Sequence, residues 1–192
     1  GFGEMIAEPD VTPDEKKRFL SILNSSSERL LKTINDFMDI SLIVSNNMEI
    51  RPNRFDLHEF MDLLYFEHRP RATAKGLTMV LTKPKEFTSL TVETDHGLFK
   101  KVFTHLLDNA IKFSLSGSIE FGYTLKDNQL QFFIKDDGVG IAPDKLKVVF
   151  EHFMQEDYLN TRKFEGSGLG LSIAKGIVEL LGGSISVTSV KG

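Results

Sequence analysis

The chain has no cysteine among its 192 residues, and it has no long apolar run and no excess of basic charge. Without cysteine it can form no disulfide and no thiolate metal site, which fits a reducing compartment. No apolar stretch approaches the roughly 20 residues of a membrane-spanning helix, and no charged and then apolar leader opens the sequence. We therefore expect these residues to form a soluble protein.

The balance of charges argues against nucleic acid as a partner. The chain has 23 basic and 27 acidic residues, a net charge of -4 and a pI near 5.8. Nucleic-acid-binding domains usually carry a basic patch or stripe, which this composition does not offer. A hydrophobic content of 41% is enough for one ordinary core and a smaller appendage.

Residues 1–46 are predicted to form a separate helical unit. Thr12-Pro13-Asp14-Glu15 supplies an N-cap, a first-turn proline and a glutamate that reaches back to the cap. From residue 19 the steps between seam positions alternate four and three, as in a coiled coil. The seam consists of Phe19, Leu23, Ser26, Leu30, Thr33, Phe37, Ile40 and Val44. Its partner helix would come from a second copy, from sequence outside these residues, or from both. The alternative is a long surface helix that lies on the following domain.

Asn46-Asn47 ends this helix, and residues 47–192 are predicted to form a second domain. We expect strands at 48–52, 77–82, 90–94, 118–125, 130–136 and 184–190, and helices at 56–76, 95–113, 143–150 and 169–181. Helices and hairpin strands are mixed without regular strand–helix–strand alternation. This order favours an α+β fold, a two-layer sandwich.

The first motif, Asn109-Ala110-Ile111-Lys112-Phe113, lies on the helix expected at 95–113. The amide oxygen of Asn109 is a hard ligand that suits a Mg²⁺ ion retaining its waters and contacting phosphates. Lys112 follows three residues later on roughly the same face, which places a cation beside the metal ligand. The alternative is a surface asparagine and lysine on an otherwise apolar helix.

The second motif, Asp136-Asp137-Gly138-Val139-Gly140-Ile141, follows an apolar strand. A carboxylate at the end of a buried strand needs a hydrogen-bond donor, and the amino group of adenine is one. Gly138 and Gly140 would allow a planar base to approach closely and would adopt positive φ angles. The alternative is a plain acidic turn.

The third motif, Gly166-Ser167-Gly168-Leu169-Gly170-Leu171, precedes a helix, so that its N–H groups can bind phosphate oxygens. It is not a P-loop, because no Lys-Ser or Lys-Thr follows, and no strand precedes it as in a dinucleotide fingerprint. The segment between the two glycine turns can fold over a ligand, and it carries Arg162 and Lys163. A flexible hinge is the alternative.

In this order the motifs resemble those of the catalytic domain of sensor histidine kinases in two-component systems. These kinases belong to an ATPase superfamily that includes DNA gyrase, MutL and the large ATP-dependent chaperone. The Lys112-Phe113 pair and a phenylalanine box, Phe150-Glu151-His152-Phe153, single out the kinases. The resemblance implies the two-layer sandwich of this superfamily, preceded by a long helix of a dimerisation hairpin. Residues 1–46 would then be a partial dimerisation and histidine-phosphotransfer hairpin, and residues 47–192 the catalytic ATP-binding domain.

The resemblance also implies ATP and Mg²⁺ as cofactors, with Asn109 as the Mg²⁺ ligand, Asp136 on the adenine amino group and Lys112 near the phosphates. His105 stands where the family often has another asparagine; it either binds metal or packs, and we favour packing. The remaining residues implied in nucleotide binding are Phe113, Gly138, Gly140, Ile141, Phe153, Arg162, Lys163, Gly166, Ser167, Gly168, Leu169 and Gly170.

The implied activity is transfer of the γ-phosphate of ATP to a histidine and onward to an aspartate of a response regulator. The implied partners are a second copy, through the hairpin helices, and a receiver domain. The region would be the cytoplasmic portion of a membrane-bound bacterial receptor, attached to the membrane only through segments outside these residues. The acceptor motif of the family, a histidine followed by glutamate and then Thr-Pro, is absent, and His58-Glu59 lacks the Thr-Pro. These residues alone are therefore not expected to autophosphorylate. A non-catalytic nucleotide-sensing or dimerisation module, and a machine that couples ATP hydrolysis to dimer closure, are the alternative functions.

Overall fold

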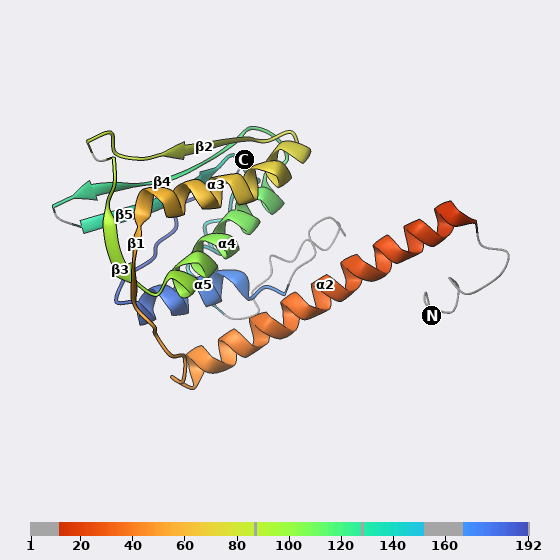
Figure 1. The fold of residues 1–192 in the computed structure, drawn as a ribbon, viewed down its shortest axis with the longest axis horizontal. Coiled ribbons are helices and arrows are strands. Elements are labelled where there is room, and N and C mark those ends of the chain that lie inside the picture. The colour runs from red at the N-terminus through yellow and green to blue at the C-terminus, as the bar shows by residue number, and fades with distance from the viewer. Residues whose placement is uncertain (1–11, 87, 128, 152–166, 192) are drawn as a thin grey trace.

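The structure is a computed structural model that describes residues 12–86, 88–127, 129–151 and 167–191. Figure 1 shows strands over a layer of helices, with one long helix leading into the domain and extending beyond it. The α+β sandwich after a long helix is thereby confirmed. The elements are α2 Pro13–Val44, β1 Asn53–Asp56, α3 Leu57–Ala74, β2 Thr78–Thr82, β3 Thr91–Thr94, α4 His96–Phe113, β4 Ser118–Lys126, β5 Gln129–Asp136 and α5 Gly170–Leu180.

Local capping sequences fix the starts of three helices. At the start of α2, the Glu15 N–H donates to Thr12 Oγ1 over 3.3 Å, and the Thr12 N–H donates to the Glu15 carboxylate over 2.9 Å. Asp56 before α3 and Asp95 before α4 each accept the backbone N–H three residues later, at 3.0 and 2.9 Å. Each cap satisfies an N–H group that lacks a partner within its helix, so these starts were predictable from sequence.

The strands form two small sheets. β1 pairs with β3 in antiparallel register, while β4 lies between β2, which is parallel to it, and β5, which is antiparallel. Helices α3 and α4 contribute buried side chains to one core with β4, whose Phe121 and Tyr123 are completely buried. This core holds α4 in a fixed position relative to the end of β5.

A second apolar cluster joins α2 to the domain. Ile40 of α2 packs with Val102 of α4 and Ile173 of α5. The helices approach closely, because a Cβ added to Gly176 of α5 would lie 2.7 Å from a methyl carbon of Ile43. The expectation that Ile40 faces a partner helix as part of the seam is wrong, since it is buried against α4 and α5 of the domain. The C-terminal part of α2 thus lies on the following domain, as the alternative interpretation had it.

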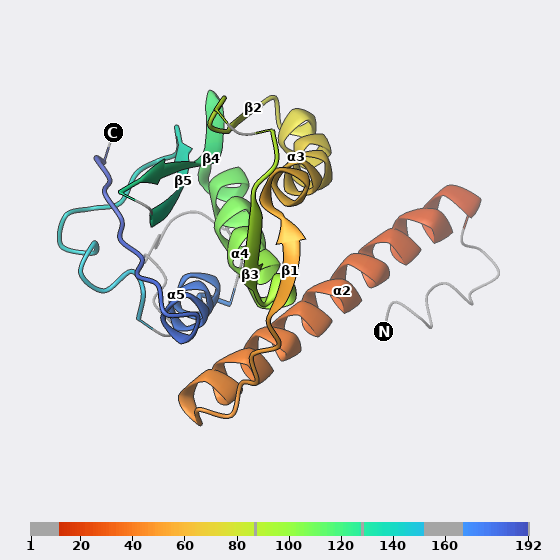
Figure 2. The ribbon, with the colours of Figure 1, turned by 60° about the vertical axis from the view of Figure 1, so that its left-hand side comes forward.

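The opposite face of α2 stays exposed in the described part of the chain. We call its large apolar residues the apolar stripe; they are Leu20, Leu23, Leu30, Leu31, Ile34, Phe37, Met38 and Leu42. Figure 2 shows α2 meeting the domain near its C-terminal end and extending past it toward the N-terminus. Within the described residues no helix combines the length and the apolar character that crossing a bilayer requires.

Three expected elements are wrong. Residues 142–151 form successive turns instead of a helix, with i to i+3 bonds such as Lys145 N–H to the Ala142 carbonyl. Residues 48–52 are not a strand, because the Arg51 N–H bonds the carboxylate of Asp95 over 2.8 Å instead of a neighbouring strand. Residues 184–190 are not a strand either: Ser189 Oγ accepts the Ile141 N–H, which ties this segment to a turn.

Candidate functional site

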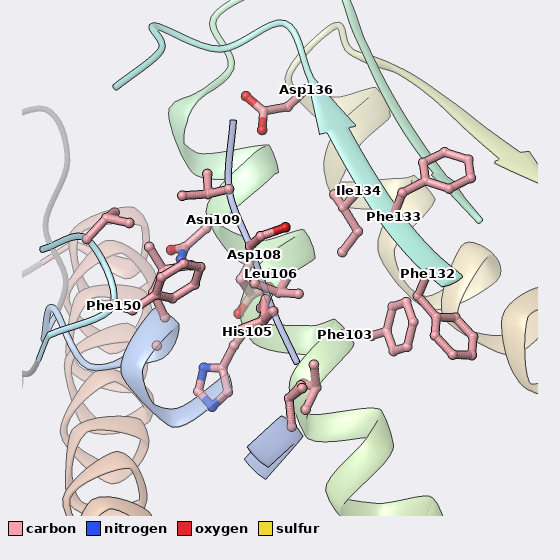
Figure 3. A pocket seen from close by; sticks show the side chains of 18 of the residues that line it. Phe103, His105, Leu106, Asp108, Asn109, Phe132, Phe133, Ile134, Asp136 and Phe150 are labelled. Atoms are coloured by element: carbon pink, nitrogen blue, oxygen red, sulfur yellow. The ribbon is translucent and has the colours of Figure 1, made fainter. Parts of the chain in front are cut away.

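A cleft of about 2540 Å³ lies between α4, the end of β5, the turn that follows it and the start of α5. Small-molecule pockets usually measure about 300–1,000 Å³, so a nucleotide would fill only part of it. Asn109, Asp136 and Ser167, one from each sequence motif, line this cleft. In Figure 3 Asp136 and His105 lie at opposite ends of the view, with Asn109 between them. Folding therefore brings the three motifs together.

The last turn of α4 carries Asn109 and Lys112, both half-buried. The Lys112 ammonium lies 4.6 Å from the ring centroid of Phe113, a cation–π distance. Burial lowers the pKa of Lys112, and the charge of Lys32 lowers it further. An anion bound beside Lys112 would offset both effects, so the ammonium group of Lys112 is a suitable partner for a phosphate.

Neighbouring elements fasten the C-terminal end of α4. Lys75, which follows α3, donates to the carbonyl oxygens of Ile111 and Lys112 over 2.7 and 3.0 Å. The Val139 N–H donates to the Phe113 carbonyl over 3.3 Å. A cation at the negative end of the helix dipole stabilises it. Lys75 was missed from the sequence, because nothing local links it to residues 36 positions later.

In the first glycine turn, Asp136 is exposed and its Oδ1 accepts the Gly138 N–H over 2.9 Å. The premise that it ends a buried strand is wrong, since residues 132–134 are only half-buried and line the cleft. Its position at the end of the cleft leaves the adenine contact a prediction.

The glycines of this turn make room for the chain itself. A Cβ on Gly138 would lie 2.5 Å from Asp136 Oδ1, and Gly138 has no positive φ, contrary to expectation. Gly140 does have a positive φ of 67°, and its Cβ would lie 2.1 Å from the carbonyl oxygen of Val190. At both positions protein atoms already occupy the space that a side chain would need, and the close approach of a base stays a prediction.

The second glycine turn leads directly into α5. Gly168 has a φ of 72°, and the Leu169 N–H points to Ser167 Oγ at 3.4 Å. Among the described residues no side chain caps α5, so its first N–H groups can serve an anion. The predicted residues Phe153, Arg162, Lys163 and Gly166 lie outside the described residues, and their roles stay predictions.

His105 lies beneath the start of α5. Its Nδ1 is 3.2 Å from where a Cβ on Gly170 would stand, and its Nε2 is 4.0 Å from Asp36 Oδ1. Burial lowers the pKa of His105, although the charge of Asp36 acts in the opposite direction. The burial of this ring between two helices fits a packing residue better than a metal ligand.

The donor set of the cleft suits a weakly held Mg²⁺ ion. The described residues contain no group of three or more His, Asp, Glu or Cys side chains that could hold a metal on their own. The amide of Asn109 lines the cleft, as does Lys112. Mg²⁺ commonly takes one or two protein oxygens and completes its shell with phosphates and water, so these residues fit Mg²⁺ arriving with a nucleotide.

A charged cluster that joins α2, α3 and α4 borders the same cleft. Lys32 Nζ and Arg71 Nη1 each lie 2.5 Å from a carboxylate oxygen of Asp108, the residue before Asn109. A second pair between α2 and α4 lies outside this cleft, where Lys101 Nζ is 2.7 Å from Asp39 Oδ1. Burial acts to raise the pKa of Asp108, but the bonds from Lys32 and Arg71 outweigh it and leave that pKa lowered. Lys32 and Asp39 lie about two helical turns apart and therefore on one face of α2, which was the only sequence signal for these contacts.

Comparison with known proteins gives a consistent result. Residues 94–192 match the family described as histidine kinase-, DNA gyrase B-, and HSP90-like ATPase. The chain is 36% identical over 183 residues to the autoinducer 2 sensor kinase/phosphatase LuxQ of Vibrio cholerae, which covers 93% of this chain and 21% of LuxQ. The chain thus spans about a fifth of the length of this relative.

Two solved structures share the fold. Full-length ShkA in complex with AMPPNP matches with a TM-score of 0.80 and 24% identity, over 95% of this chain and 37% of ShkA. Histidine kinase ThkA in complex with the response regulator protein TrrA matches with a TM-score of 0.67 and 20% identity, over 95% of this chain and 50% of that one. At these identities the likeness concerns the fold.

Proposed function

Because the chain belongs to the family of histidine kinase-, DNA gyrase B- and HSP90-like ATPases, we propose that it is the ATP-binding catalytic region of a sensor histidine kinase. The observation that carries the proposal is the meeting of Asn109, Asp136 and the second glycine turn in one cleft. Similarity to LuxQ over 93% of the chain, which includes α2, supports the kinase branch of the family.

The three motifs divide the work of holding the nucleotide. Asp136 accepts a hydrogen bond from the amino group of adenine, and Asn109 ligates Mg²⁺. Lys112 and the N–H groups before α5 bind the phosphate oxygens. Bound Mg²⁺ would neutralise phosphate charge. Phosphoryl transfer leaves little covalent work to the protein, so the contribution of these residues is positioning and charge stabilisation.

The reaction proposed for the whole protein moves the γ-phosphoryl group to a histidine. The bond between the γ-phosphorus and its bridging oxygen breaks, a bond to an imidazole nitrogen forms, and ADP leaves. His58, His68 and His105 are buried, and His96 packs edge-on against two phenylalanines. His152, the fifth histidine, lies outside the described residues, and phenylalanine follows it in place of the glutamate of the acceptor motif. We therefore propose that the acceptor is a histidine outside residues 1–192 and that these residues alone do not autophosphorylate.

The remaining assignments concern partners. Residues 1–46 would be part of a dimerisation hairpin, with residues 47–192 as the catalytic domain, and the apolar stripe of α2 would meet a second copy. The phosphoryl group would pass to a receiver domain; the complex of ThkA with the response regulator protein TrrA supports this. Similarity to a sensor kinase supports a place in the cytoplasmic portion of a receptor.

Titration calorimetry with Mg²⁺ and AMPPNP tests the site. We expect binding by the unaltered chain and at least tenfold weaker binding by two variants. Asn109→Asp disturbs the metal ligand, and Asp136→Asn replaces an accepting carboxylate oxygen by an NH₂ group, which cannot accept a hydrogen bond from the amino group of adenine. Asn24→Asp on an exposed part of α2 is the matched control and should bind normally. Unchanged titrations for both site variants would contradict the proposal.

A second experiment separates the kinase from a non-catalytic nucleotide sensor. A helical hairpin that carries an acceptor histidine is added in trans with γ-labelled ATP, and label on the hairpin is followed. Transfer that depends on Asn109 supports the kinase. Tight ATP binding without transfer would favour the sensor.

A further inference from the structure

The second glycine turn is in direct contact with α2. Ser167 Oγ donates to Asp36 Oδ2 over 3.0 Å, across 131 positions of sequence. Asp36 is only 5% exposed, and its other oxygen lies 4.0 Å from His105 Nε2. Both Asp36 and Ser167 line the nucleotide cleft. A buried carboxylate from the long helix is thus part of the wall of a site that would hold phosphates.

The position of Asp36 along the cleft determines which part of a bound nucleotide it would be near. The inference rests on the proposed function, which puts adenine at Asp136 and Mg²⁺ at Asn109. His105 lies at the opposite end from Asp136, beyond Asn109 (Figure 3). The terminal phosphate would therefore point toward His105 and Ser167, which is the end that Asp36 contacts.

Asp36 differs from the other acidic residues where α2 crosses α4. Asp39 is paired with Lys101, and Asp108 is paired with two cations, Lys32 and Arg71. Asp36 contacts a hydroxyl group and an imidazole. A buried carboxylate is weakly screened, and its repulsion of a bound anion grows with each added charge.

We propose that Asp36 is a specificity-determining residue of the nucleotide site, which disfavours ATP relative to ADP while α2 is docked. ATP carries one more negative charge than ADP, and that charge lies on the terminal phosphate. Repulsion by Asp36 therefore acts mainly on ATP. Binding linkage then requires that ATP weaken the contact between α2 and the second glycine turn more than ADP does.

The test compares the affinities of Mg²⁺-AMPPNP and Mg²⁺-ADP by calorimetry. Asp36→Asn removes the charge and keeps an oxygen that can accept the Ser167 hydroxyl. We expect the ratio of AMPPNP affinity to ADP affinity to rise roughly three- to tenfold, and to change little with salt because the carboxylate is buried. Cations that line the cleft, such as Arg29 and Lys32, are unchanged in this variant.

Three further variants isolate the charge. Glu28→Gln removes one negative charge from an exposed position on the same helix and should leave the ratio unchanged. Asp36→Glu keeps the charge and should also leave it unchanged. Asp36→Ser gives a second uncharged side chain, so that the question is decided if the asparagine variant does not fold.

The outcomes separate the two proposals. An unchanged or lowered ratio in the uncharged variants overturns the role of Asp36, as does an equal rise in Glu28→Gln. If the unaltered chain binds neither nucleotide, the proposed function fails and this inference fails with it. If it binds both nucleotides and only the ratio test fails, the proposed function stands.

Discussion

Asp108 of α4 forms a salt bridge with Lys32 of α2, in which Lys32 Nζ donates to Asp108 Oδ2 over 2.5 Å. Its side chain is only 14% exposed, whereas that of Lys32 is 54% exposed. The carboxylate is thus the buried partner, and it adjoins the predicted Mg²⁺ ligand Asn109. The contact joins the docking of α2 to the part of α4 that faces the nucleotide cleft.

Replacing this carboxylate tests how far the contact stabilises the folded chain. Asp108→Ala should lower the free energy of unfolding by about 1–2 kcal/mol, a modest value because the cations that it releases can be hydrated. Urea denaturation provides the measurement. Glu93→Gln, which breaks the exposed pair with Arg54, is the control and should have little effect. Equal stabilities of the Asp108 variant and the unaltered chain would show that the pair contributes nothing.

Two glycines of positive φ allow backbone strain to be separated from steric overlap. Gly182→Ala meets no atom within 4 Å, so it should cost about 1–2 kcal/mol for the left-handed conformation alone. Gly140→Ala incurs the same strain and also places a Cβ 2.1 Å from the Val190 carbonyl. We expect Gly140→Ala to lower the melting temperature clearly more than Gly182→Ala. Equal melting temperatures would mean that residues 187–190 move aside freely.

His105 should make stability depend on pH between about 7 and 5. Burial lowers its pKa, so the unfolded chain, with an ordinary histidine pKa of about 6.5, binds the proton more readily than the folded chain. The contribution of neutral His105 to the free energy of unfolding is therefore full above the histidine pKa of the unfolded chain, and it is lost as the pH falls through the lower pKa of the folded chain. Unfolding free energies measured at pH 7.5 and 5.5 should differ less for His105→Gln than for the unaltered chain. Parallel pH profiles would contradict this role.

The apolar stripe of α2 should govern self-association. Phe37, a member of this stripe, is 60% exposed. Phe37→Glu should convert a dimer to a monomer, because a charge placed in an apolar helix interface cannot be paired. Sedimentation equilibrium provides the measurement. Phe66→Glu, at a similarly exposed site on α3, is the matched control and should leave the association state unchanged. A monomeric unaltered chain would contradict the proposed dimer.

The features that could be predicted from the sequence are those whose causes are local. The capping residues Thr12, Asp56 and Asp95 act on N–H groups three positions away, so each helix start follows from a few letters. The three nucleotide motifs were visible for the same reason, and the resemblance to a family supplied their common cleft. The sequence was sufficient to predict a contact wherever the two interacting residues are close neighbours along the chain.

Features that depend on distant partners were missed. The bond from Ser167 to Asp36 joins residues 131 positions apart, and a seam pattern on α2 gave no reason to single out an acid. Gly140 was correctly given a positive φ, but the carbonyl of Val190, which lies where a side chain would stand, was not foreseen. Neither partner can be identified before the tertiary fold is known.

The docked end of α2 has a mechanical consequence. The part from Lys32 onward is held to the domain by ion pairs such as Lys32 with Asp108, and about 30 Å of helix lie between Pro13 and Lys32 at about 1.5 Å per residue. The helix is therefore held at one end, beside the cleft, and a tilt at that end is amplified along its length. A tilt of about 10° at the docked end would displace the far end of the helix by about 5 Å over this length, enough to change which surfaces a neighbouring helix meets.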